Sequence, residues 1–177
     1  MKALNKLKKH GHSLLFVAWL ISTVTAGIYF VQARLIWFDP QGVLNEVTSD
    51  ALIALLAEQP ELNTQDLSNS LVHFISEPCQ CSLLSENHKA ELTRKAEQLG
   101  LKVLTVRIGS EFKSIIPSTP AALIVGEHRQ LVYFGPYSVG LACASENSLI
   151  NNTLQNFELG FNSQLIENQA RGCFCNL

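Results

Sequence analysis

The chain has 177 residues, enough for one domain of ordinary size and a short appendage, and its formal net charge is −2. Its few basic residues are scattered along the exported part, which argues against nucleic acid as a partner. The sequence has no phosphate-binding loop, Ser-His-Asp arrangement or carboxylate pair, so we expect no cofactor.

The N-terminal residues predict a membrane anchor. A basic tail over 1–12 precedes an uncharged apolar segment over 13–33, which is long enough as a helix to cross a bilayer. The lysines before this segment and Arg34 after it predict a cytoplasmic N-terminus. We therefore expect a single-pass protein of the inner membrane with its C-terminal domain in the periplasm. A cleaved signal peptide is the alternative, because Val24-Thr25-Ala26 resembles a cleavage site, but the apolar run continues past it.

The expected location determines which chemistry is open to the five cysteines. The periplasm is oxidising, so cysteines there can form and keep disulfides. Because their number is odd, at least one thiol must be free, paired between chains or held by a ligand.

The rest of the chain predicts alternating helices and strands. Residues 34–47 predict a connector, and a helix over 48–59 ends at Pro60. From residue 71 the expected elements are a strand (71–76), a helix (82–100), three strands (101–108, 121–125 and 131–135) and a final helix (149–161). The buried stripe of the helix over 82–100 is predicted to comprise Leu84, His88, Leu92, Ala96 and Leu99.

This order of elements predicts an α/β domain over 48–177. The helix between the first two strands favours a parallel crossover, and the short link over 126–130 favours an antiparallel hairpin. Both pairings in one sheet, with helices on its faces, give a mixed sheet.

The same order, with a cysteine after the first strand and a proline just before the third, resembles the thioredoxin-like superfamily. Phe74 followed by Pro78-Cys79 matches the entry to the family's active site, and Thr119-Pro120 resembles its cis-proline position. The resemblance implies a thioredoxin-like fold and thiol–disulfide exchange with a protein partner in the periplasm. It also implies that the first and fourth strands run parallel.

Two departures from the family pattern affect the expected mechanism. Ser82 occupies the position of the family's second active-site cysteine, and His73 replaces the acidic residue that many thioredoxins bury before the strand phenylalanine. A simple Cys-x-x-Cys mechanism is therefore not expected.

Cys79 is the expected nucleophile, because a helix that begins beside it lowers the pKa of a thiol. Cys81 is two residues further on and would point to the other side of a helix, so it bonds Cys79 only across a strained ring; otherwise each bonds another cysteine. The implied fold brings the loop with Cys143 close to both. We thus expect Cys79 to attack, Cys81 or Cys143 to resolve, and Pro120 to shape the substrate edge. Cys173 and Cys175 are either partners of this cluster or staples for the tail.

Two other functions remain open at this level. The two Cys-x-Cys units, together with Cys143 and His73 or His88, could bind Cu(I) or Zn(II) in a metal chaperone. Alternatively, the cysteines only brace a non-catalytic binding domain. The default interpretations are that His73 is a hydrogen-bonded strand histidine, His88 a partly exposed helix residue, and Tyr133, Phe134 and Tyr137 core residues.

Overall fold

A computed structural model describes residues 2–140 and 148–177, with side chains from residue 11 onward. The chain divides into two compact units, one up to Arg34 and one from Leu35 to Leu177. Each unit is described by itself.

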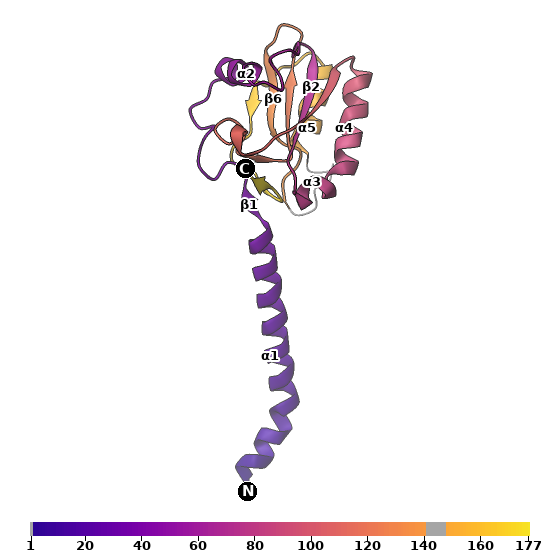
Figure 1. Cartoon of the computed structure of the whole chain (residues 1–177). Coiled ribbons are helices and arrows are strands. Elements are labelled where there is room, and N and C mark those ends of the chain that lie inside the picture. The colour runs from indigo at the N-terminus through magenta and orange to yellow at the C-terminus, as the bar shows by residue number, and fades with distance from the viewer. Residues whose placement is uncertain (1, 141–147) are drawn as a thin grey trace. The chain divides into compact units, whose positions relative to one another are not determined.

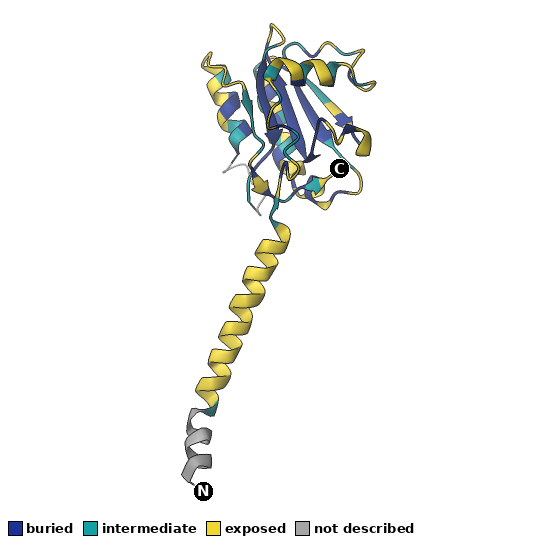
Figure 2. Cartoon of the chain, turned by 90° about the vertical axis from the view of Figure 1, so that its left-hand side faces the viewer, coloured by how far each residue is buried: buried dark blue, intermediate teal, exposed yellow. Residues whose placement is uncertain are grey.

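The first unit is a single helix, α1 (Lys2–Arg34). Within it, the segment Gly11–Arg34 contains an 18-residue window with a mean hydropathy of 2.1, and the residues of this segment from His12 onward are exposed (Figure 2). The hydroxyl of Thr23 donates to the carbonyl oxygens of Trp19 and Leu20, at 3.1 and 2.9 Å, so this polar group is satisfied inside the helix. The helix contains the expected segment 13–33 and fits a single-pass membrane anchor.

The second unit is built on a five-stranded mixed sheet (Figure 1). Its strand order is β3-β2-β5-β6-β7. β2 is parallel to β3 and antiparallel to β5, β5 is antiparallel to β6, and β6 is parallel to β7. The crossover, the hairpin and the parallel direction of β2 and β6 are therefore as predicted. The sequence did not predict β7. The bounds are β2 (Ser70–Ile75), β3 (Lys102–Arg107), β5 (Ala121–Val125), β6 (Leu131–Pro136) and β7 (Leu165–Ile166).

Two hydrophobic layers cover the faces of this sheet. Along β2, Leu71 belongs to one layer, and Val72 and Phe74 belong to the other, as the two-residue period of a strand requires. The first layer is covered by α4 (Glu86–Gln98) and α5 (Leu149–Glu158). The second is covered by α2 (Ser49–Ala57), the 3-10 turn η1 (Ser110–Phe112) and the chain around Phe38. The unit is thus α/β with helices on both faces (Figure 1).

The segment expected to be a connector, 34–47, instead packs on the sheet from residue 36 onward. β1 (Ile36–Trp37) pairs with β8 (Arg171–Gly172), and Phe38 is completely buried. The Asp39 carboxylate accepts hydrogen bonds from two following backbone N–H groups, which closes a tight turn. Apolar side chains in this short segment bury themselves against the core, which its turn signal alone did not indicate.

The helix expected over 82–100 begins earlier and is broken. α3 (Gln80–Leu84) ends at Ser85, whose hydroxyl donates to the carbonyl of Ser82 at 2.9 Å, and α4 begins at the next residue. The break removes Leu84 from the predicted stripe, and this side chain is 60% exposed. His88, which we expected to be partly exposed, is 3% exposed because α4 places it against the sheet. The other stripe members pack as predicted, with Leu92 and Ala96 buried and Leu99 half-buried.

Candidate functional site

Cys79 lies where β2 gives way to α3. β2 is almost entirely buried, and Pro78 ends the strand region because proline lacks an N–H for the ladder. Cys79 is extended and forms the N-cap of α3, as the sequence predicted for the strand-to-helix junction. The sulfur of this residue lies 3.9 Å from the carbonyl oxygen of Thr119, and the residue is only 6% exposed.

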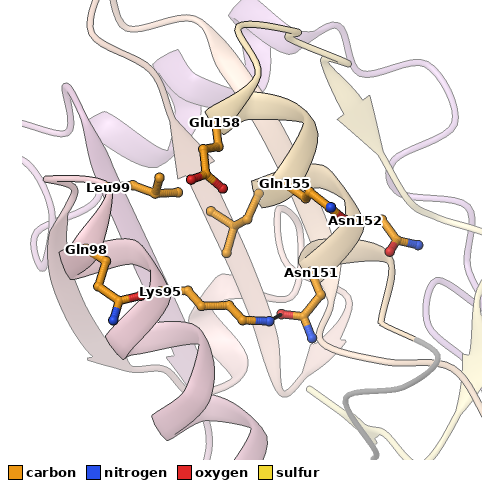
Figure 3. Close-up of a pocket in the computed structure, with 8 residues that line it drawn as sticks. Lys95, Gln98, Leu99, Asn151, Asn152, Gln155 and Glu158 are labelled. Carbon is orange, nitrogen blue, oxygen red and sulfur yellow. Dashed lines mark hydrogen bonds between the residues drawn. The ribbon is translucent and has the colours of Figure 1, made fainter.

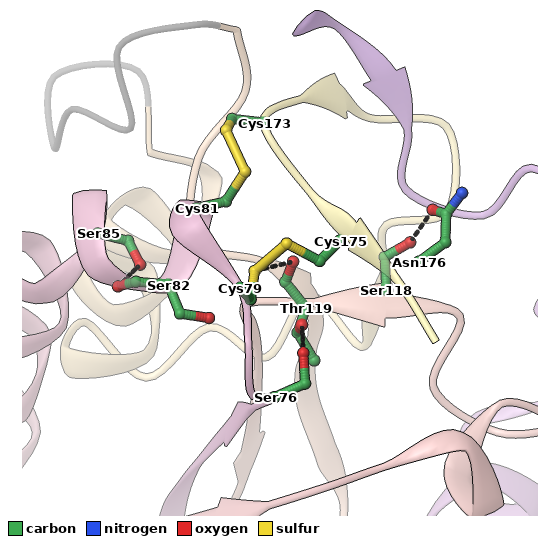
Figure 4. The surroundings of a disulfide bond; sticks show 10 residues. All are labelled: Ser76, Cys79, Cys81, Ser82, Ser85, Ser118, Thr119, Cys173, Cys175 and Asn176. Carbon is green, nitrogen blue, oxygen red and sulfur yellow. Dashed lines mark hydrogen bonds between the residues drawn. A yellow bond between two sulfur atoms is a disulfide. The ribbon is translucent and has the colours of Figure 1, made fainter.

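Four cysteines form two disulfides at this junction (Figure 4). Cys79 is bonded to Cys175, and Cys81 is bonded to Cys173. The strained Cys79–Cys81 ring therefore does not form, and each member of the first Cys-x-Cys unit bonds one member of the second. The sequence left open whether Cys79 and Cys81 bond each other or each bond another cysteine, and the structure has the second arrangement.

The shape of the backbone explains this pairing. The tail presents Cys173 and Cys175 together on the side that faces the 79–81 segment, because each is bonded to a cysteine of that segment. Phe174 lies between them and points the other way, into the core, where its ring meets that of Phe38 at 5.4 Å, edge to face. The bonds join 79 to 175 and 81 to 173, so the tail and the 79–81 segment run in opposite directions.

The tail also pairs with the chain just before Pro120. β9 (Cys175–Asn176) is antiparallel to β4 (Ser118–Thr119), with Cys175 opposite Thr119. The Thr119–Pro120 peptide bond is cis, as the resemblance predicted. The Thr119 hydroxyl lies 2.5 Å from that of Ser76, which ties this edge to the end of β2 (Figure 4). Cys79, Thr119 and Cys175 thus meet at one end of the sheet, where β2 ends and β5 begins.

Further noncovalent contacts hold the tail in place. The N–H of Leu177 donates to the carbonyl of Pro117 at 3.3 Å, and the Ser118 hydroxyl donates to Asn176 at 2.8 Å and to the carbonyl of Phe38 at 2.7 Å. Nearer the start of the tail, the Arg171 guanidinium stacks over the ring of Trp37 at 4.9 Å. The tail is therefore held to the folded unit by noncovalent contacts as well as by its two disulfides.

A pocket of about 570 Å³ opens beside Cys79, which alone among the described cysteines lines it. Its wall contains Pro78, Ser82 and the exposed Leu83, together with two ion pairs, Glu77 with Arg107 and Glu86 with Lys89. These charges balance one another. The pocket therefore offers an open, mostly apolar approach to Cys79, which is bonded to Cys175.

A buried polar cluster lies on the α4 side of the sheet. Both ring nitrogens of His73 have partners, the Tyr137 hydroxyl at 2.7 Å and the Thr93 hydroxyl at 3.1 Å, which confirms the expected hydrogen-bonded strand histidine. Burial lowers the pKa of His73 to about 4, so this residue is neutral near pH 7. Burial also lowers the pKa of His88, whose ring nitrogens have no hydrogen-bond partner among the described residues. Tyr133, Phe134 and Tyr137 are core residues, as expected.

Cys143, the other expected resolving residue, falls in 141–147 and lies outside the described residues. The described residue before that range, Gly140, pairs with the tail: its N–H donates to the carbonyl of Arg171 at 2.8 Å, and its carbonyl accepts from the N–H of Cys173 at 3.3 Å.

A second pocket, of about 520 Å³, lies between α4 and α5 (Figure 3). Its wall consists of four amide side chains, two leucines and two charged residues, Lys95 and Glu158. Lys95 already has an ion pair with Glu91 at 2.9 Å and a hydrogen bond to Asn151 at 3.3 Å. No thiol or imidazole lines this pocket among the described residues, so the cysteine junction is the stronger candidate site.

Sequence reasoning missed how closely the tail joins the site. The contributions of Ser76, Thr119 and Phe174 were not foreseen, because hydroxyl contacts and two-residue strands leave no periodic pattern. The repeated Cys-x-Cys spacing was the available signal for the tail, and it left two alternatives open.

Comparison with known proteins identifies the domain but not its activity. No curated protein and no solved structure shows a significant match to the chain. A family model described as a domain of unknown function, DUF6436, matches residues 49–177, which is most of the chain and nearly all of the second unit. The chain therefore belongs to the DUF6436 family.

Proposed function

We propose that this protein is a membrane-anchored thiol–disulfide exchange protein whose reactive bond joins Cys79 and Cys175. The observation that carries the proposal is the placement of this bond at a strand-to-helix junction, beside Thr119 and next to an open pocket. The order of strands and helices and the positions of Phe74, Cys79 and Pro120 support a thioredoxin-like fold. The anchor supports a location in the inner membrane, with the domain in the periplasm.

Exchange would begin at Cys79, because it is the described cysteine that lines the pocket. A thiolate of a partner protein attacks this sulfur, a new disulfide forms, and the Cys79–Cys175 bond breaks with release of the Cys175 thiolate, which takes a proton. A second thiolate of the partner then attacks the partner sulfur that is bonded to Cys79 and releases the Cys79 thiolate, which takes a proton. The partner dithiol is oxidised by two electrons, and Cys79 and Cys175 are reduced to thiols. The reverse sequence reduces a partner disulfide.

The surface beside the bond suits a polypeptide partner. Leu83 and Leu84 are 74% and 60% exposed on α3, next to the pocket. Exposed apolar side chains at a pocket rim favour protein contacts. A partner segment would approach over α3 and would not need to carry a particular charge, because the ion pairs at the rim are balanced.

A second candidate function is a non-catalytic binding domain with structural disulfides. The low exposure of Cys79 and Cys81, at 6% and 7%, favours this alternative. The packing of Phe174 into the core favours it too, because disulfides with a purely structural role would fix the tail in the same place.

Redox titration of the full-length chain in detergent micelles distinguishes the two functions. The chain is equilibrated in thiol–disulfide buffers of graded potential, its free thiols are alkylated, and the modified cysteines are mapped by mass spectrometry. Exchange predicts that Cys79 and Cys175 become labelled while the domain stays folded. The Cys81→Ala/Cys173→Ala variant should retain this transition, and the Cys79→Ala/Cys175→Ala variant should lose it. If the cysteines react only in denaturant, the exchange proposal fails and the structural role stands.

A further inference from the structure

The sulfurs at this junction are arranged as a set of metal ligands. Those of Cys79, Cys81 and Cys175 all lie within 4.8 Å of one another, and Cys173 is bonded to Cys81 (Figure 4). We propose that the reduced protein binds one Zn²⁺ ion through the four thiolates of Cys79, Cys81, Cys173 and Cys175. This site goes beyond disulfide exchange and does not depend on it, because it requires only that both disulfides be reduced.

The spacing of the sulfurs fits tetrahedral zinc. A Zn–S bond is about 2.3 Å long, so neighbouring sulfurs in a four-thiolate site are about 3.8 Å apart. The nonbonded separations from Cys81 to Cys79 and to Cys175 would contract by at most about 1 Å to reach this spacing, whereas the sulfurs of Cys79 and Cys175 would move apart once their bond is reduced. Cys173 is next to Cys81 through their bond but lies outside the group of three, so after reduction it must also move toward Cys79 and Cys175 to complete the site. Four sulfur ligands also match the preference of zinc for thiolate in closed structural sites.

The protein holds these ligands together without the disulfides. On one side, Cys79 and Cys81 are fixed by the junction of β2 and α3. On the other, Cys175 is fixed by its pairing with Thr119, and Phe174 by its packing on Phe38. Reduction therefore leaves four thiols in a small, largely buried space. Four thiolates there would repel one another, and a doubly charged cation removes that repulsion.

The ligand set differs from the one considered from the sequence alone. His73 is engaged by Tyr137 and Thr93, and His88 packs beside Tyr137 with a ring separation of 5.9 Å. Neither histidine belongs to the ligand group found among the described residues. The sulfur-only set makes metal binding dependent on redox state. Two dithiol reductants, each oxidised to a disulfide, supply four electrons and four protons to the two disulfides of this chain, and zinc then displaces the four thiol protons.

Cobalt titration tests the site, because Co²⁺ in a tetrahedral thiolate site gives intense visible absorption. The full-length chain in detergent micelles is reduced with a phosphine under nitrogen, freed of reductant and titrated with Co²⁺, and Zn²⁺ is then added. We expect one equivalent of Co²⁺ per chain, charge-transfer bands typical of four thiolates, and loss of these bands as zinc replaces cobalt. The oxidised chain should give no such bands.

Single substitutions define the ligands. Cys79→Ser, Cys81→Ser, Cys173→Ser and Cys175→Ser should each lose the four-thiolate spectrum, whereas His128→Gln, which changes an exposed hairpin residue, should retain it. Circular dichroism of each reduced variant without metal verifies that the domain is still folded. The proposal is overturned if the reduced wild-type chain binds no cobalt, or if a folded cysteine variant keeps the full spectrum. Disulfide exchange by the wild-type chain would be unaffected by either result, so the two proposals fail separately.

Discussion

The two disulfides should stabilise the domain in a strongly non-additive way, because they close nearly the same loop. Cys79 and Cys175 are separated by 96 positions, and Cys81 and Cys173 by 92. Once one bond has formed, the other closes only the ring made of residues 79–81 and 173–175. The perturbation that reveals this is removal of the bonds pairwise, by Cys79→Ala/Cys175→Ala, by Cys81→Ala/Cys173→Ala, and by all four substitutions together. Alanine is suitable because the sites are largely buried.

The magnitudes follow from the entropy of loop closure in the unfolded chain. A loop of nearly one hundred residues is worth about 4.7 kcal/mol, and the residual six-residue ring about 2 kcal/mol. Removing either bond should thus lower the free energy of unfolding by about 2 kcal/mol, because the other bond still closes the long loop. Removing both should lower it by about 7 kcal/mol. The variant lacking both bonds should therefore lose about 2 to 3 kcal/mol more than the sum of the two pairwise losses.

Urea denaturation of the detergent-solubilised chain, read out by pulse proteolysis, measures these free energies in the soluble domain. The loss of packed sulfurs adds a local cost to each variant, but this cost is additive and does not change the excess. If the fourfold variant loses no more than the sum of the two pairs, the bonds do not share a long loop. Local Cys79–Cys81 and Cys173–Cys175 bonds would give that result, and the connectivity would then be wrong.

Three further predictions concern the core and the tail. The pKa of His73 is about 4 in the folded state and 6.5 in the unfolded state. Above pH 6.5 the group is neutral in both states and should not affect stability. As the pH drops from 6.5 to 4 the unfolded state takes up the proton first, so the free energy of unfolding should fall by about 3 kcal/mol. In urea titrations, His73→Gln should remove this part of the acid sensitivity, and an unchanged pH profile would contradict the assignment. In Gly172→Ala the new Cβ would lie 2.7 Å from the Phe174 ring. We therefore expect the free energy of unfolding to fall by about 1 to 3 kcal/mol and the tail of the reduced chain to be cleaved faster by protease. Equal cleavage rates in the variant and the wild type would show that the ring moves aside freely. Arg171→Ala removes an exposed contact with Trp37 and should cost no more than about 1 kcal/mol by urea denaturation, so a loss above about 2 kcal/mol would mean that this stacking has a larger role.

The sheet could be predicted because its strands carry strong local signals. Residues 121–125 form a continuous apolar run and match β5 at both ends, and the short link after it allows only a hairpin. The parallel crossover between β2 and β3 followed from the helix between them. The continuous apolar runs of β2 and β5, which are buried on both faces, make the identity of these two strands largely independent of distant contacts.

The elements around the candidate site were harder to predict because they depend on long-range contacts. β4 and β9 have two residues each and exist only through pairing with each other. The break at Ser85 depends on a side-chain hydrogen bond that competes with the helix, and it moved Leu84 out of the core. Cys79 could be placed from sequence because strand, proline and helix follow one another there. Its partner could not, because Cys175 comes near only after the whole sheet has formed.

The long separation of the bonded cysteines also sets the order of events during synthesis. Cys79 leaves the ribosome 96 residues before Cys175, so the first Cys-x-Cys unit must wait for the rest of the domain. Until the tail has been made, Cys79 has only Cys81 and then Cys143 as possible partners within the chain. Native oxidation must therefore follow synthesis of the tail. Newly made chains should therefore pass through a stage with reduced or mispaired cysteines before the two native disulfides form.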